Sequence, residues 1–155
     1  LRLGWVMADR DLIAALESIK RSMNIHTSFL DQALLYEYLK NGSFEKYLRR
    51  ARKFYRARHE AAIRLATAFI PHRRIWGEGG LHIFVELAPH LNARQVLAVC
   101  YRRGVLFMPG DLFYTDGGGA NTFRLGIGRV TEAEMEKGFK IIGEVIAELE
   151  EEKNA

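Results

Sequence analysis

The sequence predicts an α/β (α+β) fold, a two-layer sandwich in which a small sheet packs against helices. Three short strand segments, residues 81–87, 105–108 and 123–127, carry this prediction, since apolar residues alternate along the first and the last of them. Helical patterns precede, separate and follow these segments. Because each helix and each sheet must bury an apolar face against another layer, this order of elements favours a sandwich.

The N-terminal part is predicted to start with a strand and to continue with two helices. Residues 1–7 alternate in polarity, which indicates a leading strand that would pair with a sheet outside this chain. A helical stripe runs over 9–20, a loop over 24–28 and a second helix over 30–39. Gly42 follows that helix and ends it, since glycine readily adopts the left-handed conformation of a helix C-terminus.

The longest predicted helix covers residues 43–69. Ser43 suits its N-cap, and Pro71 lies just beyond its end. Its apolar residues recur at three- and four-residue steps, the spacing of one helix face: Phe44, Tyr47, Leu48, Ala51, Tyr55, Ala62, Leu65 and Phe69.

The second half is predicted to pair short strands with two capped helices. A turn at 77–80 precedes the strand 81–87, and Asn92 with Gln95 resembles a capping box for a short helix. A short buried strand at 105–108 and a flexible glycine loop at 117–119 follow.

The last strand, 123–127, leads into the last helix. Thr131 and Glu134 form a second capping box at the start of this helix. We expect residues 150–153 at its end to fray. Its core stripe is Met135, Phe139, Ile142, Ile146 and Leu149.

Composition excludes several classes of protein. The single cysteine, Cys100, excludes a disulfide framework and a cysteine-rich zinc module, and its apolar neighbours indicate a core position. The histidines are not spaced as metal ligands, so we expect no metal site and a structural role for His82. No apolar run approaches the roughly 20 residues of a membrane span. We expect no membrane association and, since no signal peptide is present, a cytoplasmic protein.

The charges are unevenly distributed, although the net charge is only +4. Residues 46–64 contain eight basic side chains, and residues 132–152 contain eight glutamates. The basic stretch has two interpretations: a nucleic-acid footprint, or the solvated arginine face of an amphipathic helix. The regular apolar stripe along the same helix favours the solvated face.

Arg2 and Arg124 are the candidate binding residues. Each lies in a predicted strand between apolar neighbours. A buried arginine is costly unless an anion pairs with it, and its planar fork suits a carboxylate or a phosphate. The residues alone leave two alternatives: a bound anion, or a salt bridge to a carboxylate of the protein.

Several motifs resemble fold-type I pyridoxal-phosphate-dependent aminotransferases of class I and II. Residues 1–5, Leu-Arg-Leu-Gly-Trp, resemble the strand after the cofactor lysine of that family, and 79–85, Gly-Gly-Leu-His-Ile-Phe-Val, resemble a strand of its small domain. The strongest resemblance is Gly-Val-Leu-Phe-Met-Pro-Gly at 104–110, followed by Phe113, by Asn121 and by Phe-Arg-Leu-Gly at 123–126. The order and spacing match over essentially the whole chain.

The resemblance implies roles for both arginines. Arg2 matches the arginine that contacts the cofactor phosphate, and Arg124 matches the arginine that grips the substrate α-carboxylate. Residues 24–28 and 108–113 match segments that line the cleft between domains.

The resemblance also implies a domain division and a missing residue. Residues 1–28 correspond to the end of the large domain and its connection, and residues 29–155 to the small domain. The Schiff-base lysine of the family would lie before Leu1, so we expect no catalytic residue in this chain. We expect pyridoxal 5'-phosphate in the intact parent and none bound by the chain alone.

Two kinds of parent share this module. We favour a MocR-type transcriptional regulator of the GntR family, because the arginine-rich helix at 48–60 and the Leu-Gly-Ile-Gly-Arg run at 125–129 resemble that branch. There an amino acid or amino compound would be the effector, and DNA would be bound only by an N-terminal domain outside this chain. The alternative is a free-standing amino acid aminotransferase. Either parent is expected to be a homodimer.

Two hypotheses from other classes remain. One is a small basic nucleic-acid-binding module that uses the basic helix. The other is a purely structural dimerisation domain in which residues 1–7 pair two chains.

Overall fold

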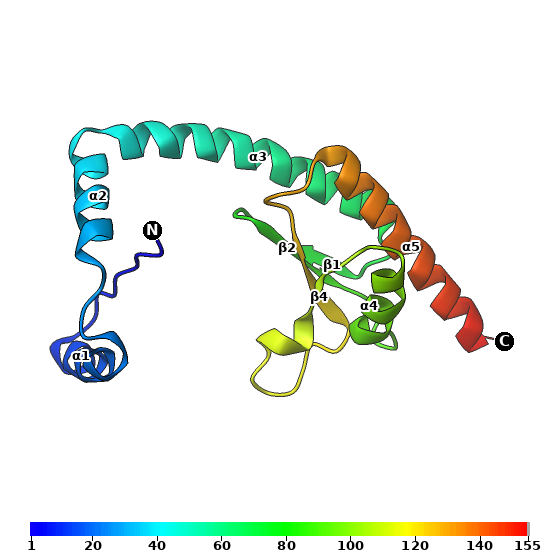
Figure 1. Ribbon diagram of the computed structural model, residues 1–155. Coiled ribbons are helices and arrows are strands. Elements are labelled where there is room, and N and C mark those ends of the chain that lie inside the picture. The colour runs from blue at the N-terminus through cyan, green and yellow to red at the C-terminus, as the bar shows by residue number, and fades with distance from the viewer. Residues whose placement is uncertain (155) are drawn as a thin grey trace. The chain divides into compact units, whose positions relative to one another are not determined.

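The computed structural model describes residues 1–154. The chain divides into two compact units, Leu1–Arg50 and Ala51–Ala155. The long helix α3, Ser43–Phe69, contributes its first residues to one unit and the remainder to the other. The ribbon is shown in Figure 1.

The first unit consists of α1, Arg10–Asn24, and α2, Phe29–Lys40, followed by the start of α3. Local capping bonds begin both short helices: Asp9 Oδ1 accepts from Leu12 N at 2.9 Å, and Ser28 Oγ accepts from Asp31 N at 3.3 Å. Gly42 has a φ of +72° and turns the chain into α3, as predicted. Neither α1 nor α2 contains a buried residue.

The predicted leading strand at 1–7 is wrong for this structure. These residues form neither helix nor strand, and Trp5 and Met7 are 85% and 95% exposed. Arg2 has a φ of +58°, a left-handed conformation that no strand residue adopts. A strand is held by hydrogen bonds to a neighbouring strand, and residues 1–7 have no such neighbour in the part of the chain that the structure describes.

The second unit contains a four-stranded antiparallel sheet in the order β1-β2-β4-β3. Its strands are β1, Arg74–Trp76, β2, His82–Glu86, β3, Met108–Pro109, and β4, Thr122–Gly126. The strands β2 and β4 confirm the predicted segments at 81–87 and 123–127. The short edge strand β1 was not predicted.

The strand predicted at 105–108 is wrong in its position and partly wrong in its burial. Only its last residue, Met108, belongs to β3, and Leu106 is 72% exposed. Phe107 is buried and its ring stacks on Phe123 with the centroids 4.4 Å apart.

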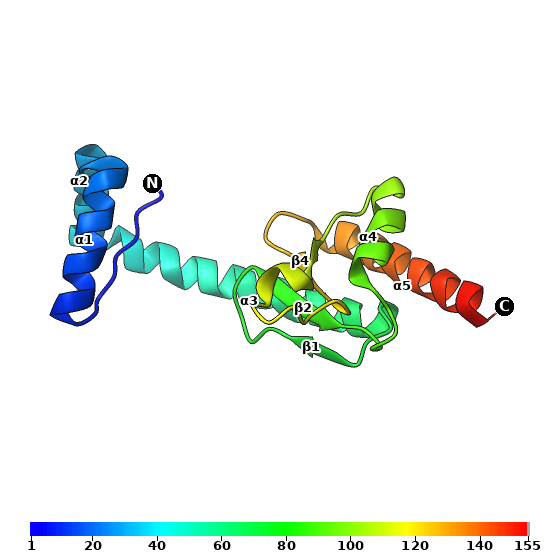
Figure 2. The same ribbon diagram turned by 90° about the horizontal axis from the view of Figure 1, so that it is seen from below.

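The core lies between one face of this sheet and three helices: the second half of α3, α4, Ala93–Arg102, and α5, Glu132–Asn154. Figure 2 shows α4 and α5 beside the sheet, and the 3-10 helix η1, Gly110–Phe113, follows β3. Cys100 is fully buried, which confirms its predicted core position. The largest fully buried side chains include Ile70, Ile83, Leu87, Phe123, Ile127, Ile142 and Ile146.

The two predicted capping boxes fared differently. The box at α5 is confirmed: Glu134 N donates to Thr131 Oγ1 at 3.2 Å, and Thr131 N donates to Glu134 Oε2 at 2.6 Å. At α4 the Asn92 side chain caps the helix, but it accepts from Arg94 N at 2.8 Å and involves no side chain of Gln95.

The end of α5 does not fray as predicted. Lys153 Nζ donates to the His90 carbonyl at 2.7 Å, and Glu150 lies 3.4 Å from His90 Nε2. These contacts tie the last turns of the helix to the loop before α4.

The arginine-rich face of α3 is mostly exposed, in agreement with a solvated face. Arg58 is the exception, since it is half-buried, stacks over Phe54 at 4.9 Å and donates to the Gly128 carbonyl at 3.1 Å. Within residues 1–154 no helix is long and apolar enough to cross a membrane. The same residues contain no group of histidine, cysteine, aspartate and glutamate side chains arranged to hold a metal ion.

Candidate anion-binding site

Arg124 lies in the middle of β4, on the face of the sheet opposite the core. Its neighbours Phe123 and Leu125 are buried, so the alternation of the strand directs the Arg124 side chain to the other face, where it is half-buried. The register places Phe84 of β2 on one side of Arg124 and Met108 of β3 on the other. Trp76 of β1 extends this row beyond Phe84.

Aromatic side chains surround the Arg124 guanidinium. Its Cζ lies 4.5 Å from the centroid of the Phe113 ring, which η1 holds over it. Phe113 meets Phe84 edge to face at 5.8 Å, and Phe84 meets Trp76 in the same way at 5.9 Å. Such a setting lowers the local dielectric and strengthens the attraction of the guanidinium for an anion.

The turn that carries Phe113 is fixed to the rest of the unit at two points, and a third contact fixes the strand beneath it. At Gly110 a Cβ atom would lie 1.8 Å from Thr122 Oγ1, so only glycine allows η1 to lie this close to β4. Asp111 Oδ2 accepts from Arg94 Nε of α4 at 2.7 Å. Asn121 Nδ2 donates to the Leu87 carbonyl at 2.8 Å and holds the start of β4 against the end of β2.

The guanidinium has unused hydrogen-bonding capacity. Arg124 Nε is buried without a hydrogen-bond partner, and no carboxylate among residues 1–154 pairs with Arg124. A buried donor without a partner is costly, and arginine satisfies its donors best with a planar carboxylate or a phosphate. The alternative of an internal salt bridge is therefore not realised at Arg124.

Arg2 is placed differently from what the sequence predicts. Its side chain is exposed rather than buried, and it lies in the irregular segment before α1. Arg2 and Arg124 belong to different units of the chain. No ion pair to Arg2 occurs within the described part of the chain, so its guanidinium is available to an anion.

Cys100 and His82 are two further side chains that the sequence analysis considered. Burial raises the pKa of the Cys100 thiol to about 11, which keeps it protonated and unreactive at neutral pH. His82 is exposed on β2, opposite Gly126.

Sequence reasoning located Arg124 but missed what surrounds it. The alternation of 81–87 placed Phe84 on the same face as His82 and Glu86, yet Trp76 was missed with its strand. Phe113 was named in the family resemblance and as the end of the segment 108–113, but its position over Arg124 was not predicted. The signal that would have identified it is the Pro-Gly pair at 109–110, because glycine there permits a tight turn against β4.

Comparison with known proteins identifies the family of this chain. The family model described as aminotransferase class I and II matches residues 1–142. The chain belongs to this family, and the predicted fold class is confirmed.

Relatives of two kinds share the sequence. An aminotransferase of Saccharolobus solfataricus is 30% identical over 94% of this chain and 37% of its own length. The 2-aminoadipate transaminase of Thermus thermophilus is 29% identical over the same shares. The HTH-type transcriptional regulator YdfD of Bacillus subtilis is 22% identical over 96% of this chain and 31% of the regulator. The chain thus spans between 31% and 37% of the length of these relatives.

Solved structures of aminotransferases share the fold of this chain. LysN, the α-aminoadipate aminotransferase of Thermus thermophilus, was crystallised with N-(5'-phosphopyridoxyl)-L-leucine; it superposes with a TM-score of 0.82 at 29% identity, over 92% of this chain and 37% of LysN. The kynurenine aminotransferase of Pyrococcus horikoshii, crystallised with PMP, superposes with a TM-score of 0.83 at 30% identity, over 91% of this chain and 35% of that enzyme.

Proposed function

We propose that Arg124 binds the α-carboxylate of an amino acid in a pyridoxal-phosphate site to which this chain contributes one part. The observation that carries the proposal is the half-buried guanidinium, whose Nε lacks a partner while Phe113 and Phe84 shield it from solvent. The planar fork would orient the carboxylate through two parallel hydrogen bonds. Arg124 would therefore act by positioning the substrate or effector rather than by transferring protons.

Pyridoxal 5'-phosphate supplies, when bound, an electron sink for chemistry at the amino group of its partner. Among the residues of this chain we propose Arg2 as a contact of the cofactor phosphate. The support is chemical: an exposed guanidinium without an ion pair in the described chain is a suitable phosphate donor. This assignment goes with a division in which residues 1–28 belong to a cofactor-bearing large domain and residues 29–155 to the small domain.

We propose that the parent is an amino acid aminotransferase, in place of the regulator that the sequence motifs favoured. Three aminotransferases match this chain at 28–30% identity over 94–95% of its length. The two whose names state a substrate are an aromatic-amino-acid aminotransferase and a 2-aminoadipate transaminase. We accordingly propose an α-amino acid as the substrate class.

The second candidate is the sensor part of a MocR-type regulator of the GntR family. It is supported by the HTH-type regulators YdfD and YisV, which match 96% of this chain at 22% and 27% identity. In such a parent Arg124 would hold an amino-compound effector, and DNA would be bound by a separate domain. A homodimeric parent is part of both proposals.

The test is substitution of Arg124 in the full-length parent. Arg124→Gln should weaken amino acid binding about 30- to 100-fold, the loss expected when a charged hydrogen-bonded partner is removed from a shielded site. Retention of cofactor absorbance should be unchanged. Arg129→Gln, which removes an exposed arginine of the same unit, is the matched control and should leave binding unaltered.

Three further measurements separate the remaining proposals. Arg2→Gln should lower the affinity for pyridoxal 5'-phosphate while amino acid binding by the loaded protein persists; unchanged cofactor affinity would refute the phosphate assignment. Turnover of an amino acid with a 2-oxo acid identifies the enzyme. DNA binding that depends on an amino compound, without turnover, identifies the regulator.

A further inference from the structure

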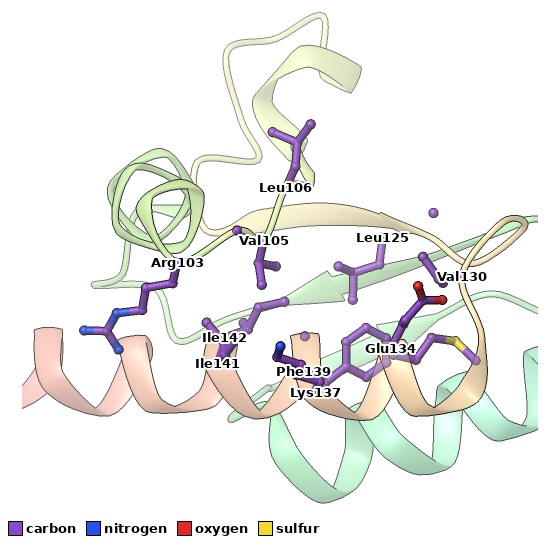
Figure 3. A pocket seen from close by; sticks show the side chains of 14 residues that line it. Arg103, Val105, Leu106, Leu125, Val130, Glu134, Lys137, Phe139, Ile141 and Ile142 are labelled. Carbon is purple, nitrogen blue, oxygen red and sulfur yellow. The ribbon is translucent and has the colours of Figure 1, made fainter.

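A second pocket lies in the unit Ala51–Ala155, on the other face of β4 from Arg124. It has a volume of about 410 Å³, within the range of roughly 300–1,000 Å³ that small-molecule sites occupy. Figure 3 shows it between the extended segment after α4, the end of β4 and the upper face of α5. Its apolar lining includes Val105, Leu106, Leu125, Met135, Phe139 and Ile142.

The pocket exists because the sheet ends early at this edge. The pairing of β3 with β4 contains only Met108 with Arg124 and Pro109 with Phe123. Continuing that register would pair Leu106 with Gly126, but Leu106 lies outside the strand. Ile127 N donates to the Leu81 carbonyl, so by the antiparallel alternation the N–H and C=O of Gly126 point away from β2 and toward this gap. Both backbone groups are available to a ligand.

Gly138 leaves space on the side of the pocket formed by α5, because it has no side chain. It lies on α5 among the lining residues, and the nearest atom to a Cβ built there is Val105 Cγ2 at 4.0 Å. A side chain at this position would extend into the pocket without a backbone clash. Glycine in a helix interior costs about 0.5–1 kcal/mol relative to alanine, so the space is maintained against helix propensity.

Two cations, Lys137 and Arg103, and one anion, Glu134, line the pocket beside the apolar surface. Lys137 and Glu134 are three residues apart on α5, hence neighbours on the helix, and both line the pocket. No ion pair joins Lys137 to any carboxylate within residues 1–154. Glu134 uses Oε2 for the Thr131 cap and leaves Oε1 free. Arg103 is occupied, because its two terminal nitrogens pair with Glu148.

We propose that this pocket binds a free α-amino acid with an apolar side chain. Lys137 would hold the α-carboxylate, Glu134 the α-ammonium, and the lining between Val105 and Ile142 the side chain. A simple carboxylate would leave Oε1 of Glu134 without a donor from the ligand, and a simple amine would leave Lys137 without an acceptor from the ligand. Only a ligand that carries both charges beside an apolar group complements the site.

The experiment compares three probes of the same shape on the chain itself. L-leucine carries both charges, 4-methylpentanoate lacks the ammonium and 3-methylbutylamine lacks the carboxylate. Titrations are followed by the amide resonances of Gly126 and Gly138. We expect saturable shifts with leucine at a stoichiometry of one, and binding about fivefold weaker for each of the other two, the upper range for an exposed charge pair.

Variants assign the binding to the pocket. Gly138→Leu should abolish leucine binding by filling the space, and the milder Gly138→Ala should reduce it. Lys137→Gln should remove the preference for leucine over 3-methylbutylamine. Glu134→Gln preserves the capping box and should remove the preference over 4-methylpentanoate.

The outcomes that overturn the proposal are distinct. Absence of saturable shifts with every probe, equal affinities for the three probes, or unchanged leucine binding by Gly138→Leu would each refute it. Arg124→Gln should leave leucine binding here intact, since Arg124 lies on the other face of β4. Loss of the shifts in Arg124→Gln alone would show that leucine occupies the Arg124 site instead.

Discussion

The two units of this chain differ in how their helices are held. Among the residues whose burial the structure describes, the twenty buried hydrophobic side chains lie between Ala62 and Ile146, in the unit Ala51–Ala155. The unit Leu1–Arg50 has capped helices and not one buried side chain. Since isolated helices of 12 to 15 residues are marginal in water, capping alone does not hold them. The comparison teaches that periodicity places helices, whereas burial stabilises them.

Hydrogen exchange should show the largest difference between the units. Amides of α1 and α2 should exchange nearly as fast as in unfolded peptides. Amides of β2, β4 and α5 should be protected about a thousandfold or more, because they exchange only when a core worth about 5 kcal/mol opens. The measurement is amide exchange by mass spectrometry of the isolated chain. Equal protection in both units would contradict the comparison.

Truncating a phenylalanine should lower the free energy of unfolding strongly in the second unit and hardly at all in the first. Phe123→Ala removes a fully buried ring and should lower the free energy of unfolding by about 3–5 kcal/mol. Phe29→Ala, at a ring that is 80% exposed, should change it by no more than about 0.5 kcal/mol. Urea denaturation followed by circular dichroism measures both. A large loss from Phe29→Ala would show that the first unit is stabilised by tertiary contacts.

A glycine-to-alanine substitution at the close contact between η1 and β4 should lower the free energy of unfolding. Gly110→Ala places a Cβ against the backbone and side chain of Thr122 and should cost about 1–3 kcal/mol. Gly79→Ala is the matched control, since no atom lies within 4 Å of its Cβ and its φ is not in the left-handed region. In the full-length parent, Gly110→Ala should also weaken amino acid binding at Arg124, because Phe113 would shift. Equal stability of the two variants would remove this link.

Low pH should lower the stability of the second unit, and this is the smallest of the four predicted effects. The backbone N–H and the hydroxyl of Thr131 lower the pKa of Glu134, and ion pairing lowers those of Glu136 and Glu148 on the same helix. A carboxyl whose pKa is lower when folded adds stability above its unfolded pKa, near 4.5, and loses it as the pH falls further. Unfolding measured from pH 6 to pH 3 should therefore show a decline that is shallower in Glu134→Gln. An identical pH profile for the variant would exclude this contribution.

Local signals explain what the sequence could predict. The cap at Thr131 and Glu134 and the alternation around Ile83 and Val85 depend on neighbours within a few residues, and both are confirmed. The three-residue strand β1 is too short to show a period and is defined only by pairing with β2. For the same reason the alternation of residues 1–7 did not suffice, since a strand requires a partner.

The candidate site was predictable to the same extent. Arg124 stood out because a cation interrupts an apolar strand. Its cover by Phe113 depends on the approach of η1 to β4, a contact that no periodicity reveals. The pocket beside Gly138 was missed as well, because it arises where a predicted strand fails to form.

Intrinsic tryptophan fluorescence can report on the Arg124 site, because Trp76 lies in the same row of side chains as Phe84, Arg124 and Met108. The chain has two indoles, one in each unit: Trp5, which is 85% exposed, and Trp76, which packs on Phe84. With Trp5 replaced by phenylalanine, all indole emission would come from Trp76. This side chain packs on Phe84, which is the cross-strand neighbour of Arg124. Filling of the Arg124 site would then be visible as a change in the colour and intensity of fluorescence, without any attached dye.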